Sequence, residues 1–234
     1  MSAQKICEGV YRVAERGGDS SIEIDGKYYY QIMDFFYIEL PAEELSPEQV
    51  SGLCQARADE PRCFGGANKK IKQLFNRFLK SNEGKTILEI GAGTNPILSE
   101  SEVSSHQIKY IGSDADNKYS GLYHFDASTN LPDDSLDVVI ALFVLHFKFY
   151  EHQISQIYEH MKEDGIFLAN VYNRNAASRE KLKQDFENVG FKVEFIVDPQ
   201  NTCRDHHYFF ASKDGIVIEK NKTVLLDLLQ RQDL

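Results

Sequence analysis

The strongest constraint on the fold is a regular alternation of short apolar segments and amphipathic segments between residues 84 and 213. The clearest amphipathic segments, Glu151–Met161 and Ala177–Val189, are predicted helices, and the apolar segments have the length of strands. The predicted strands are Thr86–Ile90, Ile108–Ser113, Tyr123–Phe125, Leu136–Ala141, Ile166–Val171, Lys192–Val197 and Tyr208–Ala211. Strands that alternate with helices form a mostly parallel sheet covered on both faces, so we predict a doubly wound α/β domain over residues 84–213.

Residues 1–83 lack this alternation, and we predict a helical or irregular N-terminal region. Aromatic residues crowd between Tyr28 and Tyr37, where they serve either packing or a lid over a substrate. Gly84 ends a predicted helix before the first strand. The apolar stripe of that helix consists of Ile71, Leu74, Phe75, Phe78 and Leu79.

Residues 214–234 are predicted to add a short strand and an amphipathic helix that includes Val224–Leu229. We expect that helix to pack within its own chain rather than against a second subunit. The protein is then a monomer or a homodimer.

The net charge of -10 argues against a nucleic-acid substrate, because binding to a phosphate backbone needs a clustered basic face. The densest basic stretch, Lys69–Lys80, is predicted to be the solvated face of a helix. No run of 18 apolar residues is present, so we expect no membrane span.

The four cysteines form no CxxC pair, and no export signal is visible at the N-terminus. We therefore expect reduced thiols and a cytoplasmic location. We expect no metal site, because His206 and His207 adjoin each other instead of having the spacing that closes a zinc site.

The first predicted strand runs into Gly91-Ala92-Gly93-Thr94-Asn95-Pro96. Glycines allow a ligand to approach the backbone closely, and exposed amides at the start of a helix attract an anion. Asn95 and Pro96 suit the N-cap and first position of a helix, so we expect a helix to begin there.

Two details separate this turn from a dinucleotide site. Pro96 stands where the GxGxxG pattern has its third glycine. Glu89 lies two residues before Gly91, where its carboxylate would repel a diphosphate and attract an ammonium or sulfonium group. At a separation of about 4 Å and an effective dielectric constant near 20, that interaction is about 4 kcal/mol. The charge favours a nucleoside that carries an amino acid over NAD.

Acidic residues end the next two predicted strands. Asp114 follows Gly91 by 23 residues, about where an acceptor for ribose hydroxyls is expected, and Asp116 is an alternative. Asp126 is suited to accept a hydrogen bond from an adenine amino group, although an ordinary turn role is also possible. The span from Asp114 to His124 is too short for a full helix, so we expect a loop there.

The ordered motifs over residues 84–212 resemble the class I S-adenosylmethionine-dependent methyltransferases. They run from Glu89-x-Gly91-x-Gly93 through the two acidic strand ends to Asp137-Val138-Val139 and Gly165–Leu168. The resemblance implies an antiparallel last strand at Tyr208–Ala211. It also implies that S-adenosyl-L-methionine contacts Glu89, Gly91, Ala92, Gly93, Asn95, Asp114, Ala115, Asp126, Ala127, Leu142 and Phe143.

Methyl transfer from a sulfonium needs alignment and desolvation, and it needs a general base only when the acceptor arrives protonated. His146, just past the fourth strand, is the best-placed catalytic candidate, with a packed structural histidine as its alternative. His124, Tyr172 and Asn173 come next.

An O or N atom of a small, partly apolar metabolite is the expected methyl acceptor. The absence of Asn-Pro-Pro-Tyr and Pro-Cys segments argues against base methylation in DNA. A protein or peptide acceptor is the second possibility and RNA the third. An inactive binding scaffold and a nucleotide-dependent oxidoreductase are the rival functions.

Overall fold

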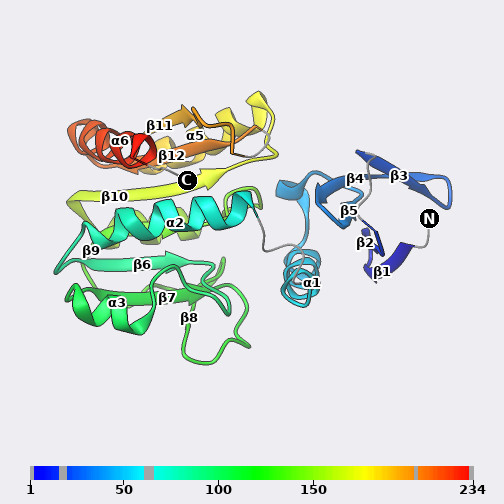
Figure 1. Cartoon of the computed structure of the whole chain (residues 1–234), viewed down its shortest axis with the longest axis horizontal. Coiled ribbons are helices and arrows are strands. Elements are labelled where there is room, and N and C mark those ends of the chain that lie inside the picture. Colours follow the sequence, from blue (N-terminus) through cyan, green and yellow to red (C-terminus); the bar gives the residue numbers. More distant parts are fainter. Residues whose placement is uncertain (1–2, 16–19, 61–65, 203–204, 232–234) are drawn as a thin grey trace. The chain divides into compact units, whose positions relative to one another are not determined.

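All seven predicted strands of the α/β region form in the computed structural model, which describes residues 3–15, 20–60, 66–202 and 205–231 (Figure 1). From one edge of the sheet to the other they are β11 (Lys192–Val197), β12 (His207–Ser212), β10 (Met161–Val171), β9 (Leu136–Ala141), β6 (Thr86–Ile90), β7 (Lys109–Asp114) and β8 (Tyr123–His124). Strand β12 runs antiparallel to both neighbours, and every other pair is parallel. The predicted doubly wound sheet with an antiparallel last strand is confirmed.

Helices cover both faces of this sheet. On one face, α4 (Glu151–His160) and α5 (Ala176–Val189) pack on a core rich in phenylalanine. On the other face lie α2 (Ala67–Lys80), α3 (Glu100–Ser105) and α6 (Gly215–Gln230). The apolar stripe predicted for α2 is buried in this second core, so α2 belongs to the α/β unit.

Strand register brings the ends of the parallel strands to one edge. Ile90 at the end of β6 is aligned with Ser113 of β7 and Ala141 of β9, and Ala141 is aligned with Ala169 of β10. In a doubly wound sheet, ligands bind at this carboxyl edge. The site lies where the order of the strands reverses its direction across the sheet. The residues that directly follow these aligned positions are Gly91, Asp114, Leu142 and Asn170.

The helix expected at Asn95 begins later, so that prediction was wrong. Ile97 and Leu98 are buried in the apolar core, which requires an irregular path after Pro96. Helix α3 then begins at Glu100, where the Ser99 side chain accepts a hydrogen bond from a backbone amide in a capping box.

The strand expected after residue 214 is also absent from the described part of the chain, where α6 occupies residues 215–230. The Asp214 side chain accepts a hydrogen bond from the amide of Ile216 (3.1 Å) and caps the helix. Ile218, Leu225 and Leu229 are buried at helical spacing. Packing of this face therefore favours a helix, although the β-branched residues at its start favour a strand.

The N-terminal unit comprises residues 1–66 together with 146–148, whereas we expected a region over residues 1–83. It contains an antiparallel sheet, which corrects the helical or irregular prediction. In sheet order its strands are β1 (Ala3–Cys7), β2 (Val10–Val13), β5 (Phe36–Ile38), β4 (Lys27–Met33) and β3 (Ser21–Ile24). A short 3₁₀ helix, Ala42–Glu44, and helix α1 (Pro47–Ala58) follow. Phe147 is part of the apolar core of this unit.

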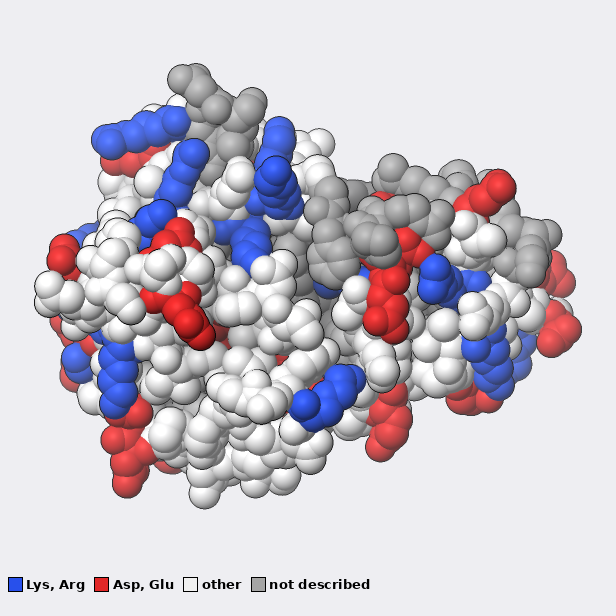
Figure 2. All heavy atoms as spheres, turned by 60° about the horizontal axis from the view of Figure 1, so that its bottom comes forward, with Lys and Arg blue, Asp and Glu red and all other residues white. Residues whose placement is uncertain are grey.

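Charged side chains of both signs are interspersed on the face drawn in Figure 2, where Lys and Arg lie among Asp and Glu. Within the described ranges, no helix has the length and apolar character needed to cross a bilayer. Of the four cysteines, Cys63 and Cys203 lie outside the described residues.

Candidate active site

The glycine turn after β6 is folded tightly against its neighbours. Gly91 and Gly93 have positive φ angles of 74° and 51°, which glycine adopts without strain. A Cβ atom on Gly91 would lie 2.5 Å from Cγ2 of Val144, so a side chain is excluded there for a second reason. The amide of Ala92 donates to the carbonyl of Ser113 at 3.0 Å. The turn is therefore held at the carboxyl ends of β6 and β7.

Asp114 joins this turn at the end of β7. Its carboxylate accepts hydrogen bonds from the amide of Gly93 (3.1 Å) and from the amide of Asp116 (2.9 Å). Burial raises the pKa of Asp114, and these two hydrogen bonds partly oppose that effect. The carboxylate of Asp116 instead forms an ion pair with Lys118. Asp114 is thus the acidic residue that adjoins the glycine turn, and Ala115 follows it.

Glu89 lies beneath the same loop. Only 2% of the residue is exposed, and its carboxylate accepts hydrogen bonds from the amide of Ile97 (3.0 Å) and from the hydroxyl of Tyr110. Burial raises the pKa of Glu89, although both hydrogen bonds act in the opposite direction. We expected this carboxylate to approach a ligand directly, whereas these contacts make it a support for the loop.

Helix α2 supplies a second support that the sequence analysis missed. The ammonium of Lys72 donates to the backbone carbonyl (2.9 Å) and to the side-chain oxygen (2.6 Å) of Asn95. One turn later, the amide of Asn76 donates to the carbonyl of Ile97 at 2.9 Å. The spacing of four residues between Lys72 and Asn76 was the available signal, but we interpreted this helix face as solvated.

Asp126 closes a turn after β8. One carboxylate oxygen accepts hydrogen bonds from the amides of Ser128 (2.8 Å) and Thr129 (3.0 Å), and the other lies 3.3 Å from Nε2 of His124. Burial alone would raise the pKa of Asp126, but the hydrogen bonds hold it below its usual range. Ala127 lies within this turn. The roles of both residues toward adenine stay predictions.

Leu142 and Phe143 follow β9 and pack on the core between the sheet and α2. Phe143 has a positive φ of 59°, which is uncommon for a bulky residue. Its amide donates to the side-chain oxygen of Asn170 at 2.7 Å, and its ring meets Tyr172 edge-on with centroids 5.7 Å apart. Asn170, which the sequence analysis did not single out, therefore fixes the backbone at Phe143.

His146 is fully buried and is grouped with the N-terminal unit, where its ring lies 4.0 Å from that of Phe147. The residues described above all belong to the α/β unit. Of the alternatives to His146, Tyr172 is brought beside Phe143, and His124 lies beside Asp126. Asn173 adopts a positive φ of 57° just after β10.

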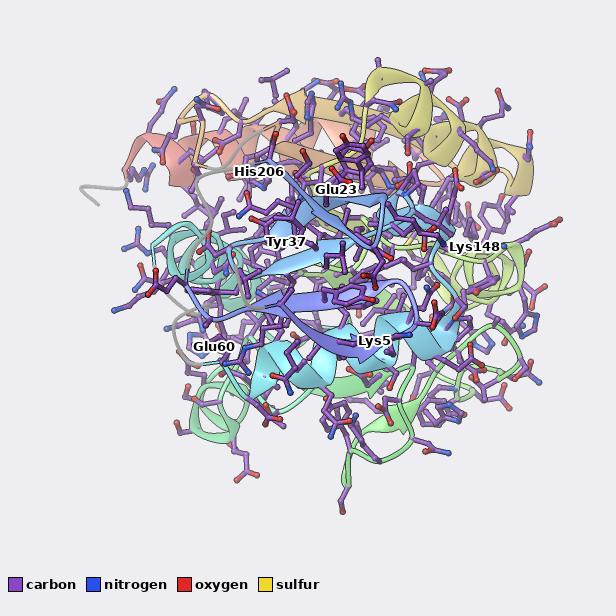
Figure 3. The ribbon with its side chains drawn as sticks, turned by 90° about the vertical axis from the view of Figure 1, so that its right-hand side faces the viewer. Lys5, Glu23, Tyr37, Glu60, Lys148 and His206 are labelled. Atoms are coloured by element: carbon purple, nitrogen blue, oxygen red, sulfur yellow. The ribbon has the colours of Figure 1, made fainter. Side chains whose placement is uncertain are left out.

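Two more polar groups at this edge escaped sequence analysis. The guanidinium of Arg174 donates to the carbonyl of Leu145 at 2.6 Å and so ties the segment after β10 to the segment after β9. His206, labelled in Figure 3, pairs through Nδ1 with the carboxylate of Asp198 at 2.9 Å. The sequence analysis considered His206 only as a zinc ligand. Because Asp198 and His206 are separated along the chain, no sequence pattern predicted that they would pair.

A family model described as a methyltransferase domain matches residues 65–214, which is more than half of the chain. Among solved structures, a TehB-like SAM-dependent methyltransferase from Corynebacterium glutamicum ATCC 13032 Kitasato is 14% identical with a TM-score of 0.49, covering 72% of this chain and all (100%) of that one. The CMeT domain of the citrinin polyketide synthase is 15% identical with a TM-score of 0.49, covering 72% of this chain and 57% of that one. No curated protein sequence matches the chain.

The buried carboxylate of Glu89 predicts a pH-dependent stability. Because its pKa is raised, the folded protein keeps a proton at pH values at which the unfolded chain has lost it. The contribution of Glu89 to the free energy of unfolding is therefore largest at pH values below the usual pKa of glutamate. It falls as the pH rises through the raised pKa of the folded state. Glu89→Gln cannot ionise and keeps an acceptor for Ile97. We expect this variant to gain stability relative to the wild type as the pH rises above the usual pKa range of glutamate.

Urea unfolding at several pH values measures this difference. Glu163→Gln is the matched control, because 88% of the Glu163 side chain is exposed. A difference between Glu89→Gln and wild type that is independent of pH would contradict the prediction.

Proposed function

This chain belongs to the class I S-adenosylmethionine-dependent methyltransferases, and we propose that it methylates an oxygen or nitrogen atom of a small, partly apolar metabolite. The observation that carries the proposal is the aromatic wall formed by Phe143 and Tyr172 at the carboxyl ends of β9 and β10. Rings at this edge suit a flat apolar acceptor. The net charge of -10 weighs against RNA as the acceptor.

The glycine turn fits the methionine end of S-adenosylmethionine. At Gly91 a Cβ would meet Val144, and the amides of Ala92 and Gly93 are already bonded to Ser113 and Asp114, so the turn of Gly91, Ala92 and Gly93 has a fixed shape that we propose borders the methionine end of the cofactor. Asn95 is held by Lys72 at the end of the turn. We propose that Glu89, when ionised, favours the cofactor's ammonium and sulfonium groups from beneath the loop.

The nucleoside end is assigned to the acidic strand ends. We place the ribose hydroxyls at Asp114, which borders the glycine turn, and the adenine beside Ala115, Asp126 and Ala127. Leu142 and Phe143 would lie beside the methyl group that the cofactor transfers. The bound cofactor supplies a methyl group that is already activated on a positively charged sulfur.

The chain's own residues then act mainly by alignment and by exclusion of water. Asn170 fixes the backbone of Phe143, and Arg174 holds the carbonyl of Leu145, so the segment after β9 is rigid where the acceptor must dock. This geometry favours an enzyme that positions its substrate. The oxidoreductase alternative is dropped, because the matched family is one of methyltransferases, and transfer of label from the cofactor distinguishes an active enzyme from an inactive scaffold.

Labelled S-adenosylmethionine tests the acceptor class. The purified full chain is incubated with the small-molecule, protein and RNA fractions of a cell extract in parallel. We expect label in products of the small-molecule fraction, because the aromatic wall suits a small flat acceptor. Label that enters only protein or only RNA would overturn the proposal.

Asp114 and Asp116 form a matched pair of variants for the ribose assignment. Asp114→Asn removes a charged hydrogen-bond acceptor, and we expect S-adenosylhomocysteine to bind about 10- to 100-fold more weakly. Asp116→Asn should change the affinity by less than about threefold, because the Asp116 carboxylate pairs with Lys118 instead of bonding to the glycine turn. Calorimetric titration measures both, and a larger loss in Asp116→Asn would reverse the assignment.

His146 stays a proposed base for a protonated acceptor. If it acts in that role, His146→Ala lowers kcat by about 10²- to 10⁴-fold while the variant still binds S-adenosylhomocysteine. The shift in melting temperature on adding that ligand reports whether the variant is folded. Unchanged turnover at saturating substrate would remove His146 from the mechanism.

A further inference from the structure

Two buried nitrogen atoms at the carboxyl edge of the sheet call for a ligand. Asn170 is fully buried and only 2% of His206 is exposed. Among the residues that the structure describes, Nδ2 of Asn170 and Nε2 of His206 are buried without a hydrogen-bond partner. Native proteins rarely leave such groups unsatisfied, because the lost hydrogen bonds to water are not replaced.

The strand register places these two side chains on the same face. Asn170 of β10 lies directly opposite Tyr208 of β12, and His206 precedes Tyr208 by two residues. The ladder continues past β11, since the amide of Asp198 donates to the carbonyl of His206 at 3.0 Å. Residues two apart share a face, and the ring of His206 lies 4.7 Å from that of Tyr208. Diagonal neighbours of this kind are about 7–8 Å apart, which side chains can bridge to one ligand atom.

The same two side chains connect to the proposed methyl site. The side-chain oxygen of Asn170 is occupied by the amide of Phe143, so its remaining nitrogen is presented beside that residue. The rings of Tyr172 and Tyr208 come from the segments that carry Asn170 and His206, and Tyr172 contacts the ring of Phe143. An acceptor that met both nitrogens would therefore contact aromatic surface.

The hydrogen-bond directions are fixed by the partners. Because Asn170 uses its oxygen for Phe143, its free nitrogen can only donate. Nδ1 of His206 lies 2.9 Å from the carboxylate of Asp198, which can only accept, so Nδ1 is the donor and Nε2 presents a lone pair whenever the ring is neutral. Burial alone would raise the pKa of Asp198, but hydrogen bonds from His206, Thr202 and Gln200 hold it well below its usual range.

A donor next to an acceptor matches a hydroxyl group. The hydroxyl proton can point to Nε2 of His206, one oxygen lone pair can accept from Asn170, and the second lone pair is left to attack. A neutral amine has a single lone pair, so it cannot accept from Asn170 and attack at once. The pair of groups thus selects oxygen over nitrogen as the methylated atom.

We propose that Asn170 and His206, with Asp198 as the positioning residue for His206, form an acceptor subsite for a phenolic hydroxyl, and that His206 is a catalytic base. The inference rests on the proposed small-molecule function and narrows it to O-methylation. A lone pair of the acceptor oxygen forms the bond to the methyl carbon as the carbon–sulfur bond breaks and its electrons stay on sulfur. The hydroxyl proton passes to Nε2 of His206, and Asp198 stabilises the resulting imidazolium. His206 belongs to the α/β unit, like the residues of the proposed cofactor site.

Nitrogen NMR tests the subsite without turnover. The full chain carries ¹⁵N-labelled histidine, is saturated with S-adenosylhomocysteine, and is titrated with p-cresol, 4-methylaniline or toluene. The His206 signals are identified by their loss in His206→Asn. We expect p-cresol to shift the Nε2 resonance of His206, 4-methylaniline, a weaker hydrogen-bond donor, to shift it less, and toluene to leave it in place. The absence of any shift with p-cresol, or an equal shift with toluene, would overturn the subsite.

Activity with labelled S-adenosylmethionine supplies the second measurement. For methylation of p-cresol, His206→Asn should lower kcat by at least about 100-fold and leave the stabilisation by S-adenosylhomocysteine intact. His207→Asn is the matched control and should keep the wild-type rate, because His207 is partly exposed and its Nδ1 bonds only to a local carbonyl. A His206→Asn variant that retains wild-type turnover would overturn the catalytic role.

The acceptor preference separates this inference from the function on which it rests. Methylation of 4-methylaniline in preference to p-cresol would overturn the hydroxyl subsite and leave the small-molecule function in place. Label found only in protein or RNA would overturn both.

Discussion

A buried carboxylate beneath the loop after β6 is the interaction on which the candidate site depends. A charge out of water is costly unless hydrogen bonds replace its hydration, and Glu89 has two donors, the amide of Ile97 and the hydroxyl of Tyr110. Tyr110 belongs to the neighbouring strand β7, so the same carboxylate ties the loop to the sheet. The bare backbone at Gly91 and Gly93 keeps its shape because this support lies directly under it.

The parallel sheet assembles the rest of the site. Its register aligns the ends of β6, β7, β9 and β10, so groups from four distant segments reach one edge. Asp114 then adjoins the glycine turn through the amide of Gly93, and Asn170 adjoins Phe143 through its backbone amide. A methyl group on sulfur is already activated, so a rigid edge of this kind can do much of the catalysis by alignment. The Asp198–His206 pair adds a means of removing a proton at the same edge.

Predictions succeeded where the signal was local and repeated. Strands β6, β9 and β11 were predicted at their observed bounds, because each is a short apolar run between turns. The N-terminal sheet was missed although Asp25-Gly26 is a strong hairpin signal. Both residues have positive φ, 51° and 78°, and they join β3 to β4 as a two-residue hairpin turn requires. We interpreted the crowded aromatic residues around that hairpin as packing or lid residues and did not predict strands there.

Errors at element ends have a common physical cause. Asn95 and Pro96 have good helix-start propensity, yet the helix begins at Glu100 because Ile97 and Leu98 are taken into the core first. Likewise, Ile216, Val217 and Ile218 favour a strand by propensity, but the Asp214 cap and the burial of one helix face decide otherwise. Tertiary burial outweighs differences in local propensity, which are smaller.

By itself the sequence determined the α/β class, the glycine turn, the acidic strand ends and the order in which they occur, since all of these are properties of neighbouring residues. Only the tertiary structure decided that Glu89 supports a loop, that Lys72 holds Asn95, and that Asn170 and His206 share one face. Those relations join residues that are 21 or more positions apart along the chain, except Ile97 with Glu89. They depend on the register of the strands and on how the helices pack against the sheet. Both are determined by the packing of the whole core, and no local sequence pattern specifies them.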